Sequence, residues 1–209
     1  PEFSTKKYPG ARWFQEGNVQ DKEGEEGTIQ PRNHWSFDAV NHIVAAVRAR
    51  THAKGKVIIF GHSAGGQFMH RYSLLDGRAD VDAIVCANAG WFTMPDDTTC
   101  YPYGTKGLGL SDADLASAFA LPVIMLMGSE DVSREQPFRA TPEADAQGKN
   151  RMERCLHYFD ACQKKAEELG VPFNWKKGVV EGAAHEGGKM AEGAMKLFCE
   201  EPLDETVGM

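Results

Sequence analysis

Gly61-His62-Ser63-Ala64-Gly65 has the pattern G-x-S-x-G. In this pattern a strand turns abruptly into a helix and presents a serine hydroxyl, in a strained and exposed position, to an acyl carbon. The glycines leave room for close backbone and for the incoming acyl group. Here an apolar run at residues 57–60 precedes the motif and a helical pattern follows it. The alternative is a Gly-rich turn without catalysis. A catalytic role for Ser63 therefore requires a base and an acid elsewhere in the sequence.

A serine hydroxyl is a weak nucleophile near neutral pH and needs a base, which an acid in turn orients. Two later apolar runs end in suitable residues: residues 121–127 lead into GSED at 128–131, and residues 173–180 lead into EGAAH at 181–185. The order serine, acid, histidine, each after a strand, is the expected one. We therefore predict Ser63 as nucleophile, His185 as general base and acid, and Asp131 as the orienting carboxylate. Glu130 is the alternative acid.

The other histidines are weaker candidates. Five of them lie on or near predicted helices: His34, His42, His52, His70 and His157. Of these, His157 is expected to be solvated or a packing residue. His62 adjoins the nucleophile and is predicted to be a pocket or packing residue. HExxH is absent, and neither CxxC nor a Cys/His spacing typical of zinc occurs. The sequence therefore predicts no metal and no cofactor.

A substrate pocket is expected around the serine. The backbone N–H of Ala64, the residue after the nucleophile, is predicted to bind the oxyanion. His62, Asn88, Trp91 and Tyr103 are predicted to line the pocket, because residues that follow parallel strands meet at the edge where ligands bind. Aromatic and apolar residues continue through this region, and they either line an acyl pocket, form a lid, or pack a long loop: Trp91, Phe92, Met94, Tyr101 and Tyr103.

The elements that position these residues alternate along the chain. Apolar runs predict strands at 57–60, 83–87, 123–127 and 173–180, the last nearer a sheet edge because it contains Trp175 and polar residues. Helical stripes lie between and around them, at 40–47, 64–75, 152–169 and 190–198. This alternation predicts an α/β domain with a mostly parallel sheet. Residues 91–120 interrupt it and are predicted to form a lid-like excursion.

These motifs resemble those of the α/β-hydrolase superfamily. GHSAG, GSED and GAAH match its three catalytic motifs in order, and WSFDAV, GHSAGGQF, ANAGWFTMP and VPFNW are similar to one group within it. That group consists of uncharacterised bacterial hydrolases related to polyhydroxybutyrate-depolymerase-like and feruloyl-esterase-like esterases. The resemblance implies an α/β-hydrolase fold and a serine esterase that cleaves a small-molecule carboxylic ester through an acyl-enzyme. A peptidase, an acyltransferase or a hydrolase-fold binding protein without turnover are the alternatives.

Length and composition set the remaining expectations. The 209 residues, 42% hydrophobic and 25% charged, suit one α/β-hydrolase domain over 1–209. Only 62 residues precede Ser63, which predicts that the family's N-terminal strands and its second oxyanion donor are missing. The chain is therefore expected to be the C-terminal part of a domain, the alternative being a reduced sheet.

The charge and cysteine content exclude some functions. A net charge of −7 without a basic stripe argues against nucleic-acid binding. No apolar run approaches the ~18 residues of a membrane span, so a soluble chain is expected. Most of the five cysteines are predicted to be buried thiols. No targeting segment is visible, and the compartment stays open.

Overall fold

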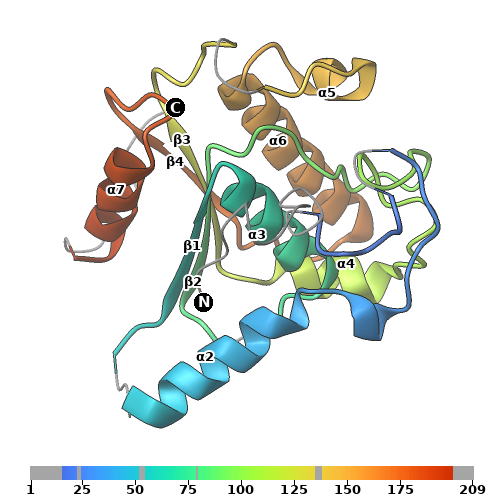
Figure 1. Cartoon of the computed structure of the whole chain (residues 1–209), viewed down its shortest axis with the longest axis horizontal. Helices are drawn as coiled ribbons and strands as arrows, with labels where there is room; N and C mark the ends of the chain where they lie inside the picture. Colours follow the sequence, from blue (N-terminus) through green and yellow to red (C-terminus); the bar gives the residue numbers. More distant parts are fainter. Residues whose placement is uncertain (1–15, 23–24, 52–54, 79, 135–137, 200–209) are drawn as a thin grey trace.

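Four parallel strands form the sheet that positions the predicted site (Figure 1). In spatial order they are β1 (Ile58–His62), β2 (Ala83–Ala87), β3 (Val123–Gly128) and β4 (Lys176–Val180). The computed structural model describes residues 16–22, 25–51, 55–78, 80–134 and 138–199, and the statements below concern these residues. The predicted parallel α/β architecture is confirmed, and β4 lies at an edge of this sheet, as predicted.

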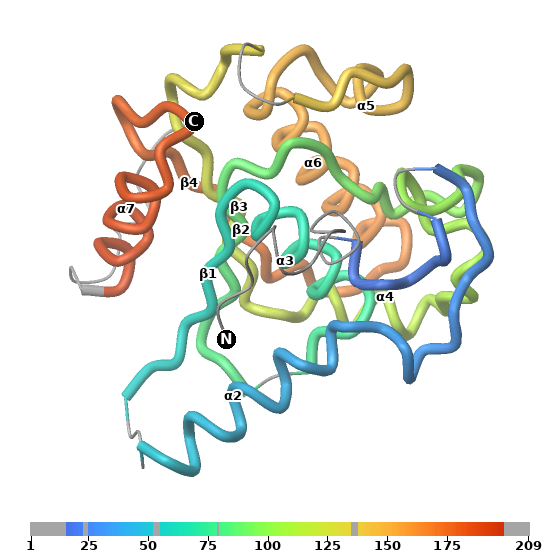
Figure 2. Tube along the Cα trace, in the orientation of Figure 1, coloured from blue at the N-terminus to red at the C-terminus, as the bar shows by residue number. Residues whose placement is uncertain are grey.

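Helices cover both faces of the sheet. They are the short 3-10 helix η1 (Arg32–His34) and the α-helices α2 (Asp38–Thr51), α3 (Ala64–Leu75), α4 (Asp112–Phe119), α5 (Pro142–Gln147), α6 (Arg151–Leu169) and α7 (Gly187–Cys199). The trace in Figure 2 shows α7 on one side of the strands and α3 and α6 on the other. This layering is typical of a parallel sheet, whose crossover connections run through helices.

The two faces of β2 show why the sheet is covered twice. Ile84 and Cys86 point into the larger core with α3 and α6, whereas Val85 and Ala87 point into a smaller core with α7. All five residues of β2 are buried. A continuous apolar run of this kind is what a central parallel strand requires.

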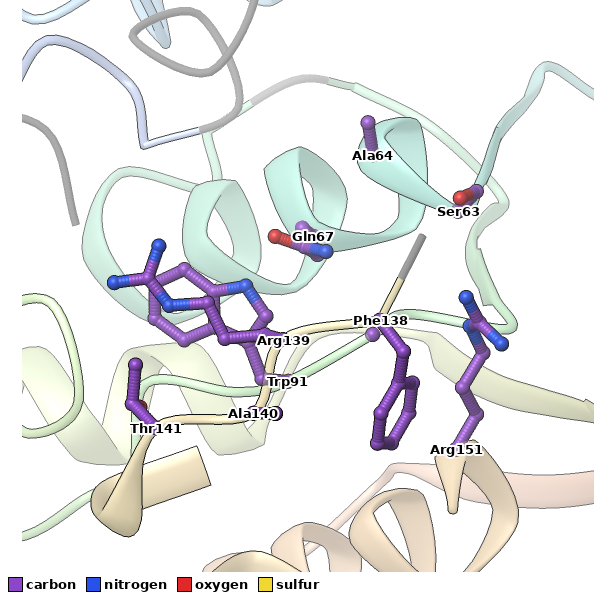
Figure 3. A pocket seen from close by; sticks show the side chains of 10 residues that line it. Ser63, Ala64, Gln67, Trp91, Phe138, Arg139, Ala140, Thr141 and Arg151 are labelled. Carbon is purple, nitrogen blue, oxygen red and sulfur yellow. The ribbon is translucent and has the colours of Figure 1, made fainter. Parts of the chain in front are cut away.

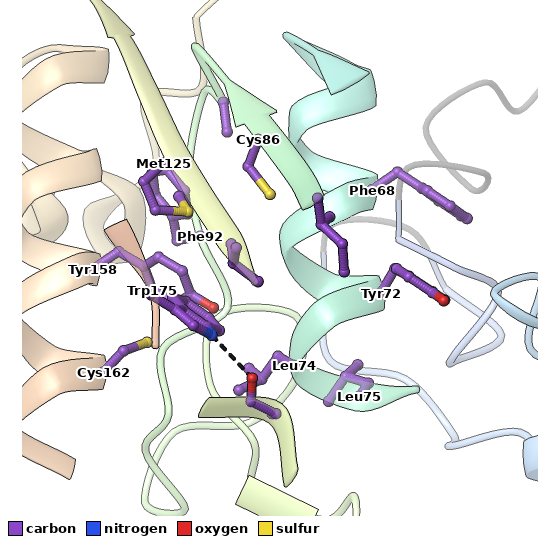
Figure 4. Packing of buried hydrophobic residues seen from close by; sticks show 14 of the residues in the cluster. Phe68, Tyr72, Leu74, Leu75, Cys86, Phe92, Met125, Tyr158, Cys162 and Trp175 are labelled. Carbon is purple, nitrogen blue, oxygen red and sulfur yellow. Dashed lines mark hydrogen bonds between the residues drawn. The ribbon is translucent and has the colours of Figure 1, made fainter. Parts of the chain in front are cut away.

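The larger core is rich in aromatic side chains (Figure 4). Tyr158 of α6 stacks on Phe92, with ring centroids 4.6 Å apart. Trp175, just before β4, donates its Nε1–H to the carbonyl oxygen of Ala118 at 2.9 Å. Phe92 and Tyr101, in the segment predicted as a lid-like excursion, are 0% and 1% exposed. These two aromatic residues are therefore packed into the protein, while lid movement of the segment stays a prediction.

Several expectations about helices need correction. The stripe predicted on α2 is only half buried, because Val40 and Val44 face the core while Ile43 and Val47 are each 43% exposed. Two short helices were not predicted, α4 and α5. Both carry an N-cap that the sequence contains: Ser111 accepts from the backbone N–H of Asp114, and Thr141 accepts from that of Ala144.

Three cysteines are buried thiols, as predicted: Cys86, Cys155 and Cys162. Burial raises the pKa of Cys155 to about 12, so this thiol stays protonated and unreactive near neutral pH. Cys100 is half-buried. The side chain of Cys199 lies outside the described residues.

His70 of α3 is fully buried and makes two hydrogen bonds that fix its neutral form. Its Nδ1 lies 3.3 Å from the carbonyl oxygen of Gly66, and its Nε2 accepts the backbone N–H of Thr93 at 3.0 Å. Burial, followed by the charge of Arg71, holds the pKa of His70 well below its usual value of 6.5. A proton on Nε2 would remove the acceptor for Thr93.

We predict that His70 weakens the fold at acid pH. The unfolded imidazole takes up a proton as the pH falls below about 6.5, whereas the folded one does not, so the unfolded state binds more protons. The free energy of unfolding should then fall by up to about 1.4 kcal/mol for each pH unit. Urea unfolding at pH 7.5 and 5.5 should show a smaller decline for His70→Gln than for the wild type. Equal declines in the two proteins would rule out this role.

Candidate active site

Ser63 occupies the sharp turn between β1 and α3. Its backbone has φ 57° and ψ −114°, a conformation that residues with a Cβ rarely adopt. Its N–H donates to the carbonyl oxygen of Ala87, at the end of β2, at 2.9 Å. The turn is thus strained and tied to the neighbouring strand, which fixes the direction of the serine side chain.

Two glycines make this turn possible. A Cβ on Gly61 would lie 2.3 Å from the carbonyl oxygen of Gly65, and one on Gly66 would lie 2.5 Å from that of Ala87. Both contacts are with backbone, which cannot swing aside as a side chain can. A Cβ on Gly65 would meet nothing within 4 Å. The motif's second glycine is therefore not required by packing, whereas Gly66 is.

This geometry predicts the effect of single methyl groups. Gly61→Ala and Gly66→Ala should each lower the free energy of unfolding by about 1–3 kcal/mol, the usual cost of overpacking. Gly65→Ala is the matched control and should be neutral or stabilising by up to about 1 kcal/mol, because alanine favours the helix. Urea unfolding of the three variants gives the comparison. Equal losses at all three positions would contradict the steric explanation.

A chain of hydrogen bonds joins Ser63, His185 and Asp131. Nε2 of His185 lies 2.9 Å from Oγ of Ser63, and its Nδ1 lies 2.7 Å from Oδ2 of Asp131. Asp131 is 3% exposed, whereas the alternative acid Glu130 is exposed and directs only its backbone N–H inward, to the carbonyl oxygen of Ala183. The structure therefore brings together Ser63, His185 and Asp131, and leaves Glu130 aside.

The loops after β3 and β4 are bound to each other. The N–H of Ser129 donates to the carbonyl oxygen of Val180 at 3.1 Å, and Ser129 Oγ accepts the N–H of Gly182 at 2.9 Å. These two bonds hold the loop of Asp131 against the loop of His185. These contacts fix the positions of the two loops from which Asp131 and His185 reach each other.

Asn88 ties the same loops to the end of β2. Its Nδ2 donates to the carbonyl oxygen of Ala184 at 3.1 Å, and its Oδ1 accepts the N–H of Gly128 at 2.8 Å. Its backbone is left-handed, with φ 45°, and the residue is 3% exposed. Asn88 was predicted to line the pocket. The structure instead uses both ends of its amide to hold the backbone on either side of the site.

His62 packs against the imidazole of His185, with ring centroids 4.7 Å apart. Burial, followed by the neighbouring His185, lowers the pKa of His62. Its ring is therefore neutral near pH 7. Of the two roles predicted for His62, packing describes its position.

Arg151, the first residue of α6, is a partner that the sequence did not indicate. Its Nη1 lies 3.2 Å from Oδ1 of Asp131, and both side chains are only 3% exposed. Asp131 thus accepts from His185 on one oxygen and from Arg151 on the other. An arginine just after an N-cap asparagine has no distinctive pattern, so only the fold could reveal this contact.

A pocket of about 630 Å³ opens beside Ser63 (Figure 3). The residues that line it come from the elbow, the segment after β2, the segment before α5 and the start of α6: Ser63, Ala64, Gln67, Gly90, Trp91, Phe138, Arg139, Ala140, Thr141 and Arg151. Of the predicted pocket residues, Trp91 lies in this lining. Tyr103 instead lines an adjoining pocket of about 530 Å³, and His62 and Asn88 lie outside both linings.

Within the described residues, no group of three or more His, Cys, Asp or Glu side chains could hold a metal ion. In the same part of the chain, every helix is too short or too polar to cross a membrane.

Two solved structures match this chain over nearly its whole length. Poly(aspartic acid) hydrolase-1 from Sphingomonas sp. KT-1 is 36% identical, with a TM-score of 0.85 over 94% of this chain and 74% of that one. The poly(3-hydroxybutyrate) depolymerase LpqC from Bordetella parapertussis is 32% identical, with a TM-score of 0.85 over 99% and 69%. The chain belongs to the α/β-hydrolase superfamily. The predicted relationship of this α/β hydrolase to esterase-like members of the superfamily is therefore confirmed.

A more distant structure agrees in fold. An IroE-like serine hydrolase from Shewanella oneidensis is 13% identical, with a TM-score of 0.50 over 90% of this α/β hydrolase and 57% of that chain. At this identity the likeness concerns the fold alone. No protein-family model and no curated protein matches the sequence.

Proposed function

We propose that this α/β hydrolase is a serine hydrolase that cleaves a carboxylic ester through an acyl-enzyme on Ser63. The observation that carries the proposal is the position of His185, within hydrogen-bond distance of both Ser63 Oγ and Asp131 Oδ2. With Asp131 accepting from Nδ1–H, the lone pair of Nε2 is free to accept the serine proton. The membership of the superfamily and two hydrolase relatives above 30% identity support the same conclusion.

The residues have distinct roles in the proposed reaction. Ser63 Oγ attacks the acyl carbon while His185 takes its proton, and the tetrahedral oxyanion is bound by the N–H of Ala64. Ala64 begins α3 and lines the pocket, and the first N–H groups of a helix are not used within it. His185 then returns the proton to the leaving alcohol, and water releases the acid by the same steps in reverse.

Labelling with a fluorophosphonate tests this function directly. The full chain should gain the mass of one phosphonyl group on Ser63, whereas Ser63→Ala should gain none. Circular dichroism of both proteins before labelling establishes that each is folded. A folded wild-type chain that takes no label would overturn the proposal. Tight binding of a substrate analogue without any acyl-enzyme in the mass spectrum would instead support a binding protein.

Amide hydrolysis is the second candidate, because the relative at 36% identity is a hydrolase of poly(aspartic acid), a polymer joined by amide bonds. The same three residues would cleave either bond. p-Nitrophenyl butyrate and butyryl p-nitroanilide share an acyl group and differ only in the leaving atom. An ester-to-anilide ratio of kcat/KM larger than the ester-to-anilide ratio of the uncatalysed rates would support the esterase. A smaller ratio would support the amidase. Transfer of the butyryl group to added alcohol in preference to water would indicate an acyltransferase.

A further inference from the structure

The pocket beside Ser63 is lined by arginine side chains in a chain whose net charge is negative. Its lining among the described residues includes two arginines, Arg139 and Arg151, and neither aspartate nor glutamate. The whole chain carries a net charge of −7. Arg151 is paired with Asp131, so an incoming anion would be attracted chiefly by the charge of Arg139. A cation in a partly enclosed pocket attracts an anion more strongly than the same charge does in open water.

The two arginines are not equivalent. Arg151 lies on the Ser63 side of the pocket and its Nη1 is engaged with Oδ1 of Asp131 (Figure 3). Arg139 lies away from Ser63, next to Trp91 and with Gln67 between them and the serine. A substrate whose acyl carbon reaches Ser63 would therefore present its distal end, and not its reacting end, to Arg139.

Neighbouring side chains hold the guanidinium of Arg139 in place. Its Nε–H donates to the hydroxyl oxygen of Tyr103 at 2.8 Å, and that hydroxyl lies 2.7 Å from Oγ1 of Thr141. Its central carbon lies 5.1 Å from the ring centroid of Trp91 and 5.7 Å from that of Tyr103. A planar cation oriented in this way loses little conformational freedom when it binds a carboxylate.

The adjoining pocket limits where an anion can lie. It shares Arg139 and Thr141 with the first pocket, but its lining also contains Glu25, Glu26 and Glu143. Beyond Arg139 an anion would therefore meet like charges. The favourable position for a negative group is on the Ser63 side of Arg139.

We propose that Arg139 binds a carboxylate at the distal end of the acyl group, and that the preferred substrates are therefore monoesters of short dicarboxylic acids. This inference rests on the proposed function and adds the substrate class. Arg139 acts here as a specificity residue, since it contacts the substrate away from the reacting atoms. A neutral acyl chain of the same length should fit the same space without the ionic contact.

Two substrates of similar length test this proposal: mono-p-nitrophenyl glutarate and p-nitrophenyl valerate. After subtraction of the uncatalysed rates, Arg139→Gln should lower kcat/KM for the glutarate ester about 10- to 100-fold, the loss expected for a charge-assisted contact. It should change kcat/KM for the valerate ester by less than about three-fold. Arg139→Lys keeps the charge without the planar guanidinium. Its kcat/KM for the glutarate ester should therefore lie between that of the wild type and that of Arg139→Gln. Arg78→Gln removes an equal charge at an exposed position outside both pocket linings and should preserve the wild-type ratio.

An unchanged glutarate-to-valerate ratio in Arg139→Gln would overturn the carboxylate subsite while leaving the hydrolase intact. Fluorophosphonate labelling of each variant separates the two claims, since labelling reports on Ser63 and not on Arg139. If the wild type takes no label, calorimetric titration with monomethyl glutarate still decides the subsite. Binding that is lost in Arg139→Gln would support it, and absence of binding to the wild type would overturn it.

Discussion

Ser63→Ala and His185→Ala are each expected to lower kcat for p-nitrophenyl butyrate by about 10⁴- to 10⁶-fold, and the double variant should be no slower than the slower single one. The reason is the hydrogen bond of 2.9 Å between Ser63 Oγ and His185 Nε2, which makes the two residues one proton-transferring unit. Once the hydroxyl is gone the imidazole has no proton to accept. Once the imidazole is gone the hydroxyl is not activated.

Steady-state kinetics of the two single variants and the double variant measure this coupling. Losses that multiply in the double variant would mean that the residues act independently, contrary to the proposed mechanism. His42→Ala is a suitable control, because His42 lies on α2 with its side chain 80% exposed. It should retain wild-type kcat and KM.

Asp131→Asn is expected to lower kcat by about 10⁴-fold and also to destabilise the fold by about 3–5 kcal/mol. The loss of activity follows from the imidazole, which no longer has a carboxylate to hold Nδ1–H and stabilise its charged form. The loss of stability follows from Arg151, which is 3% exposed and would keep a buried positive charge without its anion. Replacing a residue that served only the reaction would not be expected to lower the free energy of unfolding on this scale.

Arg151→Met separates these two effects. It removes the cation and leaves the Asp131–His185 hydrogen bond, so kcat should fall much less than in Asp131→Asn, while the free energy of unfolding falls by a similar amount. In the double variant the loss of stability should be smaller than the sum of the single losses, because neither charge is left alone. Urea unfolding and kinetics of the three proteins give both readouts. Strictly additive stability losses would show that the ion pair is not the source of the effect.

The parts of the fold that the sequence predicted well are those with strong periodicity. α3 and β2 were predicted with their observed limits, and β1 and β3 to within two residues. The placement of Ser63, Asp131 and His185 after three parallel strands also followed, because such strands end at one edge of a sheet. Each of these predictions used local pattern together with a rule of topology.

Features that depend on contacts distant in sequence were not predictable. Arg151 lies 20 residues from Asp131, and Asn88 lies 96 residues from Ala184, so no local pattern joins them. Arg139 lies in a segment with neither helical nor strand periodicity. The helices α4 and α5 were missed for a different reason, since their caps were present in the sequence but their eight and six residues were too short to show an apolar stripe.

Asn88 places unusual demands on a single side chain. The left-handed backbone at this position, with φ 45°, is accepted readily by glycine, asparagine and aspartate. Glycine lacks the amide, aspartate lacks the donor for the carbonyl oxygen of Ala184, and glutamine carries its amide one methylene too far. In a library containing every replacement at each position, selected for hydrolysis, position 88 should therefore tolerate almost nothing but the original residue. This intolerance of substitution would come from the backbone groups that Asn88 binds rather than from contact with a substrate.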